Sequence, residues 1–389
     1  MRRLLLLALF LAVFLGFFSQ KKEMRQISPE EKQELVNYLK NHWKSPEDYV
    51  VEKFKEYDFV FVGEYHRIKH DLELIHNLIP RLYQAGVYNL GIEFGVYELQ
   101  DKVDALIKAD EYDEDLAREI MFKWIVYWGN KEYMDIYRKA WELNKSLPRN
   151  AQKFRVVNLS YRPDWSALQE KMSTKLWRKF WHKGNPDVHM ADVIFKEFVN
   201  KGQKALIYSG THHAFTHYYQ PFYDYEKKKF LRFTKNRMGN LIYQKIPDKV
   251  FHIVLHKPWQ TKESEEILNY PVGGVIDQVM MEFENKRVGF DVKDSPFGKL
   301  RDEGTYYAFG YEDFALSTFC DGYIFQKHFK DYDGCTIDRK FITEKNLKEA
   351  IDCFDDFAER KNLKTVEDFI NLMRERADLK KRLKEQGLE

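Results

Sequence analysis

Two short segments of the chain end in the same way, and both carry side chains that can move protons. The segments FVFVGEYHRIKH (59–70) and KALIYSGTHHAF (204–215) are apolar runs that break at a glycine, and a histidine stands three residues after each glycine. These histidines are His66 and His213, and Glu64 lies just before the first of them. Imidazole and carboxylate groups are common general acids and bases, so the repeated ending predicts a functional site.

A third candidate, Glu93, lies inside an apolar segment. VYNLGIEF (87–94) places it between Ile92 and Phe94, where an unpaired buried carboxylate would cost several kcal/mol. We therefore expect Glu93 to have a partner and to contribute to the site. His212, beside His213, is expected either to contact substrate or to pack against neighbours.

Apolar segments alternate with amphipathic ones along most of the chain, which predicts strands that alternate with helices. Strands are expected at 57–64, 87–94, 153–165, 204–210, 249–259 and 321–326. Helices are expected at 28–43, 70–86, 98–147 and 187–202, followed by charged amphipathic helices after about residue 335. The pattern favours an α/β fold with a mainly parallel central sheet, helices on both faces and a helical C-terminal cap.

The expected sheet gives a reason for the repeated ending. In open parallel sheets, ligands bind beyond the carboxyl ends of the strands. A glycine there lets the backbone turn sharply and lets a substrate come close. The residues expected to act in catalysis are Glu64, His66, Glu93 and His213. The residues expected to bind substrate are Asn158, Arg162 and His212.

The overall composition limits the possible functions. The chain has 389 residues, of which 44% are hydrophobic and 16% aromatic, enough for a large core. Its 63 basic residues nearly balance its 61 acidic residues, and a net charge of +2 gives no reason to expect a nucleic-acid partner. The expected partner is a small-molecule or peptide substrate.

The first 20 residues have the pattern of an export signal. Two arginines precede an apolar run from Leu4 to Phe18, which is short for a membrane span but fits the apolar part of a signal. We therefore expect an exported protein that is periplasmic, secreted or held at a membrane through this segment alone. The sequence leaves open whether the segment is cleaved.

The C-terminal part of the chain contains all the cysteines. Cys320, Cys335 and Cys353 allow either one disulfide or free thiols, and their spacing is not that of a zinc site. The expected organisation is a signal or anchor at 1–20, an α/β domain at 28–334 and a helical extension at 335–389.

Three motifs, GEYH (63–66), GIEF (91–94) and GTHH (210–213), resemble those of a known superfamily. It joins the ChaN-like haem-uptake proteins, the Tiki/TraB metalloproteases and the erythromycin esterases. The segment at 124–148 is similar to a tryptophan-rich helix of the esterase branch, and HMADVIF (189–195) is similar to a helix of the family that begins with Met-Ala. The resemblance covers about residues 59–215.

The resemblance implies hydrolysis by one of two mechanisms. In a metalloprotease-like site, His66, Glu93 and His213 would bind a divalent metal and Glu64 would be the general base. In an esterase-like site without metal, His66 would activate water directly. Glu64 and Glu93 would then orient the histidine or water and stabilise its charged form, and His213 would assist at the leaving group or the oxyanion.

The resemblance also raises an alternative and a departure. ChaN-like relatives imply haem or iron binding without catalysis, and haem requires an axial His or Tyr beside an apolar face. The family often has an Arg-Asp pair before the Met-Ala helix. Here Asp187 matches the aspartate and Pro186 takes the place of the arginine. If that arginine stabilises an oxyanion in the relatives, this chain must use another residue, for which Arg162 is the candidate, or it lacks the activity.

Overall fold

The computed structural model describes residues 21–284 and 286–388. Residues 1–20, expected to form the export signal, lie outside the described residues. Within the described part, no helix is long and apolar enough to cross a membrane.

A seven-stranded sheet forms the centre of the molecule, with the strand order β10-β11-β7-β1-β4-β2-β3. All neighbouring strands are parallel except β10 and β11. The expected α/β fold with a mainly parallel sheet is therefore confirmed. The strands are β1 (Phe59–Glu64), β2 (Asn89–Val96), β3 (Arg155–Ser160), β4 (Ala205–Gly210), β7 (Val250–Leu255), β10 (Val288–Asp291) and β11 (Gly322–Phe325).

Apolar side chains on both faces of the strands explain why this sheet is buried. Along β1, Val60 and Val62 pack into one hydrophobic cluster, while Phe59 and Phe61 pack into another on the opposite face. Successive side chains of a strand point to opposite faces, so a continuous apolar run requires cover on both. Helices supply that cover, as the sequence predicted.

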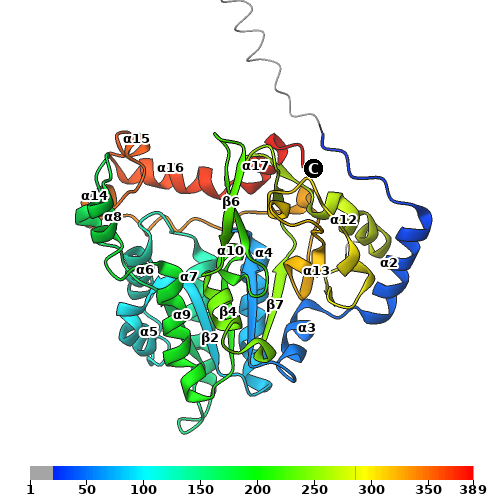
Figure 1. Ribbon diagram of the computed structural model, residues 1–389. Helices are drawn as coiled ribbons and strands as arrows, with labels where there is room; N and C mark the ends of the chain where they lie inside the picture. The colour runs from blue at the N-terminus through cyan, green and yellow to red at the C-terminus, as the bar shows by residue number, and fades with distance from the viewer. Residues whose placement is uncertain (1–20, 285, 389) are drawn as a thin grey trace, which may run out of the picture.

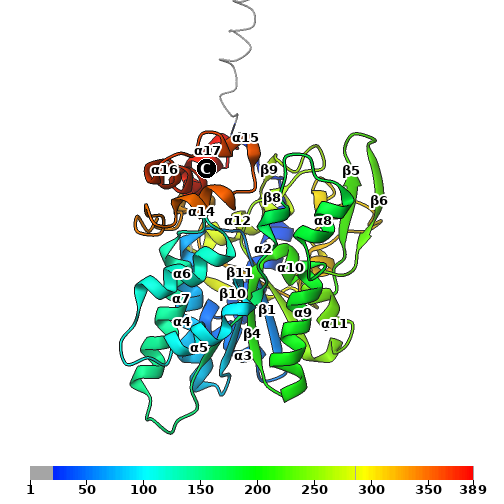
Figure 2. The same ribbon diagram turned by 90° about the vertical axis from the view of Figure 1, so that its left-hand side faces the viewer.

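The helices form two layers around the sheet. Helices α4 to α7 lie on one face, and α9 and α11 lie on the other (Figure 2). The helices that begin in the first two thirds of the chain are α2 (Pro29–His42), α3 (Pro46–Lys53), α4 (Lys69–Gln84), α5 (Gln100–Leu106), α6 (Glu114–Trp124), α7 (Lys131–Ser146), α8 (Thr174–Phe180), α9 (Pro186–Glu197), α10 (Thr211–Ala214) and α11 (Met238–Tyr243). Ser28 caps α2 by accepting a hydrogen bond from the backbone N–H of Glu31, which agrees with the pattern in the sequence.

Later elements complete the molecule. Two small antiparallel pairs flank the sheet: β5 (Gln220–Asp224) with β6 (Lys229–Thr234), and β8 (Trp259–Gln260) with β9 (Leu268–Asn269). The remaining helices are α12 (Val275–Met280), α13 (Leu316–Phe319), α14 (Leu347–Asp352), α15 (Phe357–Arg360), α16 (Val366–Ala377) and α17 (Leu379–Glu385).

The expected long helical stretch at 98–147 is helical in the structure, but it consists of three helices. The structure divides this stretch into α5, α6 and α7, and the break before α7 receives the C-terminal segment. Asn130 forms a β-bridge with Ile337, and a β-carbon on Gly129 would lie only 2.7 Å from the ring of Phe341. A helix through residues 125–130 would leave no room for these contacts.

The C-terminal extension packs on the same core as the sheet. Apolar residues of the extension belong to the hydrophobic cluster that also contains β1 and β2 side chains, among them Phe341, Phe354 and Phe369. Helices α16 and α17 lie across one end of the sheet (Figure 1). All three cysteines are buried and free, so of the two possibilities that the sequence left open, free thiols are confirmed.

Candidate active site

The two similar segments lie side by side because β1 and β4 are neighbours in the sheet. Their register pairs Gly63 with Ser209 and Glu64 with Gly210, so both chains leave the sheet at the same level. Neither glycine has room for a side chain. A β-carbon on Gly63 would lie 2.9 Å from Thr211 Cα, and one on Gly210 would lie 2.7 Å from His66 Cε1.

Glu64 and His66 form a hydrogen-bonded pair at the end of β1. His66 Nδ1 lies 2.7 Å from Glu64 Oε1. The buried Glu64 carboxylate also accepts hydrogen bonds from the hydroxyls of Tyr133 and Tyr208. An acceptor-only carboxylate makes Nδ1 the protonated nitrogen, which leaves Nε2 as a free acceptor. The His66 side chain is 39% exposed, so Nε2 is available to a ligand.

Phe94 and Trp128 hold the ring of His66 edge-on, with centroid distances of 5.8 and 5.3 Å. Glu64 fixes its tautomer and the two aromatic rings fix its orientation. Such a histidine is prepared to accept a proton from a molecule in front of Nε2.

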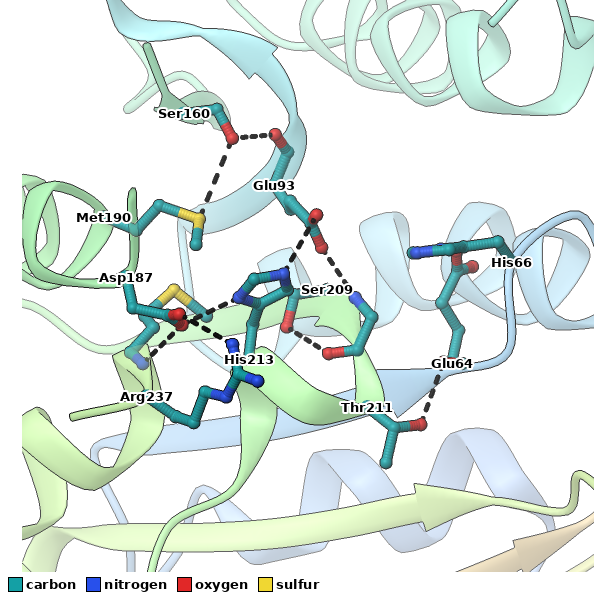
Figure 3. Close-up of polar contacts among 12 residues, drawn as sticks. Glu64, His66, Glu93, Ser160, Asp187, Met190, Ser209, Thr211, His213 and Arg237 are labelled. Carbon is teal, nitrogen blue, oxygen red and sulfur yellow. Dashed lines mark hydrogen bonds and ion pairs between the residues drawn. The ribbon is translucent and has the colours of Figure 1, made fainter. Parts of the chain in front are cut away.

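Glu93 and His213 form a second charged group beside the pair of Glu64 and His66 (Figure 3). Glu93 Oε2 accepts a hydrogen bond of 2.8 Å from the backbone N–H of Gly210, and its Oε1 lies 3.4 Å from His213 Nε2. The expectation that Glu93 has a partner is therefore confirmed. The other nitrogen of His213, Nδ1, lies 2.7 Å from Asp187 Oδ1.

Two carboxylates make His213 a cation. Burial tends to lower the pKa of His213, but Glu93 and Asp187 outweigh it and raise the pKa to about 9. Burial likewise tends to raise the pKa of Asp187, while the cations of His213 and Arg237 hold it below its usual value. Arg237 Nη1 lies 3.1 Å from Asp187 Oδ2. His213 is thus protonated at neutral pH and can donate a proton.

A cleft with a volume of about 310 Å³ opens above these groups. The ends of β1, β4 and β7 supply most of its wall, and the rest comes from Gln260 of β8, Tyr307 and the C-terminal helices. Its lining residues are Glu64, Tyr65, His66, Arg67, Gly210, Thr211, His212, His213, Lys257, Pro258, Gln260, Tyr307, Arg376 and Arg382. The volume is at the lower end of the range for small-molecule sites.

His212 lines this cleft beside His213. Its Nε2 lies 3.2 Å from the hydroxyl of Tyr307. Burial, helped by the nearby Lys257, lowers the pKa of His212 well below its usual value, so His212 is neutral. It can exchange hydrogen bonds with a substrate without adding charge.

Two residues expected to bind substrate lie outside the cleft lining. Asn158 is fully buried within β3, where its side-chain oxygen accepts a 2.8 Å hydrogen bond from the hydroxyl of Tyr137. Arg162 bonds to Glu349 of α14 at 2.7 Å. The end of β3 faces core helices and the C-terminal extension, so the structure does not bring these two side chains together with the others, and their contacts with substrate stay a prediction. Arg237 is the guanidinium that bonds to Asp187.

The sequence reasoning missed several residues of the cleft. Lys257 lies just after β7, in the segment HKPW (256–259). A lysine at the end of a predicted strand is the signal that could have placed it in the site. Arg376 and Arg382 lie more than 300 positions after His66, and no local pattern connects them with it. Tyr133 and Tyr208, which hold Glu64, appear in the sequence as ordinary apolar positions of a helix and a strand.

The donor set does not fit the expected divalent metal. In the part of the chain that the structure describes, no three His, Cys, Asp or Glu side chains are placed to hold a metal ion. A metal ligand must offer a free nitrogen lone pair. His213 instead is protonated, with carboxylates facing both of its nitrogens. The geometry therefore agrees better with an acid-base pair than with a set of ligands.

Comparisons with known proteins show the fold. No family model and no curated protein matches this chain. A solved succinoglycan biosynthesis protein is similar, with a TM-score of 0.50 and 11% identity, over 77% of this chain and 97% of that one. The matches include a mutant of the erythromycin esterase EreC, with a TM-score of 0.44 and 10% identity, over 78% of this chain and 96% of that one. They also include the haem-binding ChaN of Campylobacter jejuni, with a TM-score of 0.35 and 15% identity, over 57% of this chain and 89% of that one. At these identities what is shared is the fold.

Proposed function

We propose that this protein hydrolyses an ester bond in a small molecule that enters the 310 Å³ cleft. The observation that carries the proposal is the presence of an oriented base and a protonated acid in one site. His66 offers a free Nε2 because Glu64 holds Nδ1, and His213 is kept protonated by Glu93 and Asp187. A general base and a general acid that serve one reaction are typical of hydrolytic sites.

The proposed reaction begins with a water in front of His66. Nε2 takes a proton from the water as its oxygen forms a bond to the carbonyl carbon of the ester. His213 then gives its Nε2 proton to the alcohol oxygen as the bond between carbon and that oxygen breaks. The products are a carboxylic acid and an alcohol. His66 releases its proton to solvent, and His213 takes one up.

Haem binding is a second candidate, and one observation favours it. Tyr65 and His66 are consecutive residues that both line the cleft, and either side chain can be an axial ligand of haem iron. The hydroxyl of Tyr65 is buried and has no hydrogen-bond partner within the described residues. Against haem, four basic residues line the cleft where the macrocycle needs an apolar face. We therefore place hydrolysis first.

The test of hydrolysis is a panel of nitrophenyl esters and short peptides assayed with the purified protein and with His66→Ala. We expect ester turnover in the native protein and a loss of at least about 100-fold in the variant, since general bases contribute about 10²–10⁴-fold. His42→Ala is the matched control, because His42 is exposed on α2 and bonds only locally to Tyr38.

Two results would contradict the proposal. Equal turnover by the native protein and His66→Ala would show that the activity arises elsewhere. An absence of turnover, together with a Soret band on haem titration that His66→Ala or Tyr65→Phe removes, would replace hydrolysis by haem binding.

A further inference from the structure

The cleft has an imbalance of charge. Four of its lining side chains are basic, namely Arg67, Lys257, Arg376 and Arg382, and Glu64 is the one carboxylate in the lining. Glu64 is itself fully occupied by His66, Tyr133 and Tyr208. The opposing carboxylates of an ordinary solvated surface are therefore missing from this wall.

The buried position of Lys257 shows that the fold itself maintains this imbalance of charge. The residue is only 3% exposed, and its ammonium donates a 3.1 Å hydrogen bond to the neutral hydroxyl of Tyr307. Among the described residues, no carboxylate lies within ion-pair distance of it. Burial lowers the pKa of Lys257 to about 7. A buried lysine without a counter-charge is costly unless a ligand supplies one.

Arg67 is a second cation of the cleft, and its backbone conformation is strained. Its backbone has φ = 71°, a left-handed conformation that costs a side-chain-bearing residue about 1–2 kcal/mol. The guanidinium stacks on Trp128 at 4.0 Å from the ring centroid, and it forms no ion pair within the described part of the chain. Strained residues of this kind are found at ligand sites, where the surrounding structure maintains them.

The C-terminal helices bring two more arginines to the opposite wall. Arg376 of α16 is neutralised by Glu359 at 2.7 Å. Arg382 of α17 lies over the ring of Tyr65 at 5.4 Å, and no carboxylate of the described chain pairs with it. Lys257, Arg67 and Arg382 are thus three cations that converge on one cleft without a counter-charge.

We propose that this cleft binds the oxyanion group of a small anionic substrate, and that a phosphate monoester is the class that fits. The proposal rests on the proposed function and names its substrate class. A phosphate monoester carries about −1.5 to −2 charges at neutral pH, which matches two to three uncompensated cations. Guanidinium groups bind its oxygens in a bidentate manner. The oxyanion serves as the recognition group, and no bond to it breaks.

The test measures the binding of inorganic phosphate by calorimetry to a chain of residues 21–389 at low ionic strength. We expect saturable binding that is at least about 10-fold tighter than the binding of acetate. Lys257→Met, which keeps the length and packing of the side chain, should weaken phosphate binding at least about 10-fold. Arg67→Gly should weaken it similarly while it raises the thermal midpoint, because glycine accepts the left-handed backbone.

Arg149→Met is the matched control, because Arg149 is exposed and lies outside the cleft. Phosphate binding that is equal in the native protein, Lys257→Met and Arg67→Gly would overturn the inference, as would a lack of binding to the native protein. Phosphate binding that depends on Lys257, without turnover of any ester, would support the anion site and contradict the proposed hydrolysis. Turnover of neutral esters without phosphate binding would support the proposed hydrolysis and contradict the anion site.

Discussion

Glu93 connects the two halves of the site at the scale of single residues. One of its oxygens binds the N–H of Gly210 and the other faces the cationic ring of His213. Glu93→Gln keeps the shape and removes the charge, so we expect the pKa of His213 to fall by about one unit or more. Hydrolysis should fall about 10–100-fold, as for other supporting groups. NMR titration of the imidazole and kcat measurements give the two results.

Glu98→Gln is the control for this change, because Glu98 is partly exposed and pairs with Lys183 away from the cleft. If Glu93→Gln prevented folding, Glu93 would be a structural partner, and the assignment of His213 as the acid would lose its support. An unchanged pKa of His213 in a folded variant would contradict the electrostatic argument directly.

The raised pKa of His213 also predicts a pH dependence of stability. The folded pKa is about 9 and the ordinary value is 6.5, so the native state holds this proton more tightly than the unfolded state does. Its contribution is complete below pH 6.5 and is lost as the pH rises through about 9. One pKa unit corresponds to about 1.4 kcal/mol, so this proton contributes at most about 3 kcal/mol to the free energy of unfolding. The 24% exposure of the side chain reduces that contribution.

The measurement compares urea unfolding of the native protein and of His213→Gln between pH 6 and pH 10. The free energy of unfolding should decrease over this interval in the native protein, and the decrease should be smaller in the variant by about 1–3 kcal/mol. Parallel curves for the two proteins would show that His213 does not hold its proton in the folded state.

At the scale of elements, the contact between Gly334 and the end of α16 decides where the C-terminal arginines lie. A β-carbon on Gly334 would lie 1.7 Å from the carbonyl oxygen of Ala377. Gly334→Ala must therefore displace the end of α16. We expect a loss of about 1–3 kcal/mol in stability, as for other overpacked sites.

The same variant should bind phosphate more weakly, because Arg376 and Arg382 flank the displaced residue. Calorimetry and thermal unfolding measure the two effects. Gly304→Ala is the control, since the nearest atom to its β-carbon is Asp302 Oδ1 at 3.5 Å. Loss of stability with unchanged phosphate affinity would show that the C-terminal helices do not shape the cleft.

At the scale of the whole molecule, the first described residues form hydrogen bonds with segments far along the chain. The backbone N–H of Lys22 donates to the carbonyl of Gly387, and that of Arg25 donates to Gly273. A chain that begins at Lys21 should therefore unfold at the same temperature as the full chain. One that begins at Ile27 should lose about 1–2 kcal/mol, because each hydrogen bond contributes about 1 kcal/mol.

The proposal of export makes a separate prediction for residues 1–20. In its host, the full chain should be found outside the cytoplasm, while the chain that begins at Lys21 should stay inside. Cell fractionation followed by immunoblotting measures this. If both chains are found in the cytoplasm, the first 20 residues are not an export signal.

Local patterns in the sequence were sufficient for six of the seven strands of the central sheet, all except β10, and for the polar residues that follow them. Apolar runs that end in glycine predicted β1 and β4, and a carboxylate inside an apolar run predicted a partner for Glu93. Both arguments rest on costs that apply over a few residues, the burial of a charge and the steric demand of a turn. The same local arguments predicted the helical stretch at 98–147 but not its division into three helices, which depends on distant packing.

The arrangement of the site depends on contacts between segments that are far apart in the chain. The sheet order sets β4 between β1 and β2 and thereby brings Glu93 to the N–H of Gly210, whereas β3 at the edge directs Arg162 towards Glu349. The cations of the cleft come from the end of β7 and from α16 and α17. The charge of His213 also depends on such contacts, because Glu93 and Asp187 lie beside it only in the folded chain. Electrostatic interactions depend on the distance between atoms, and separation along the sequence does not give that distance.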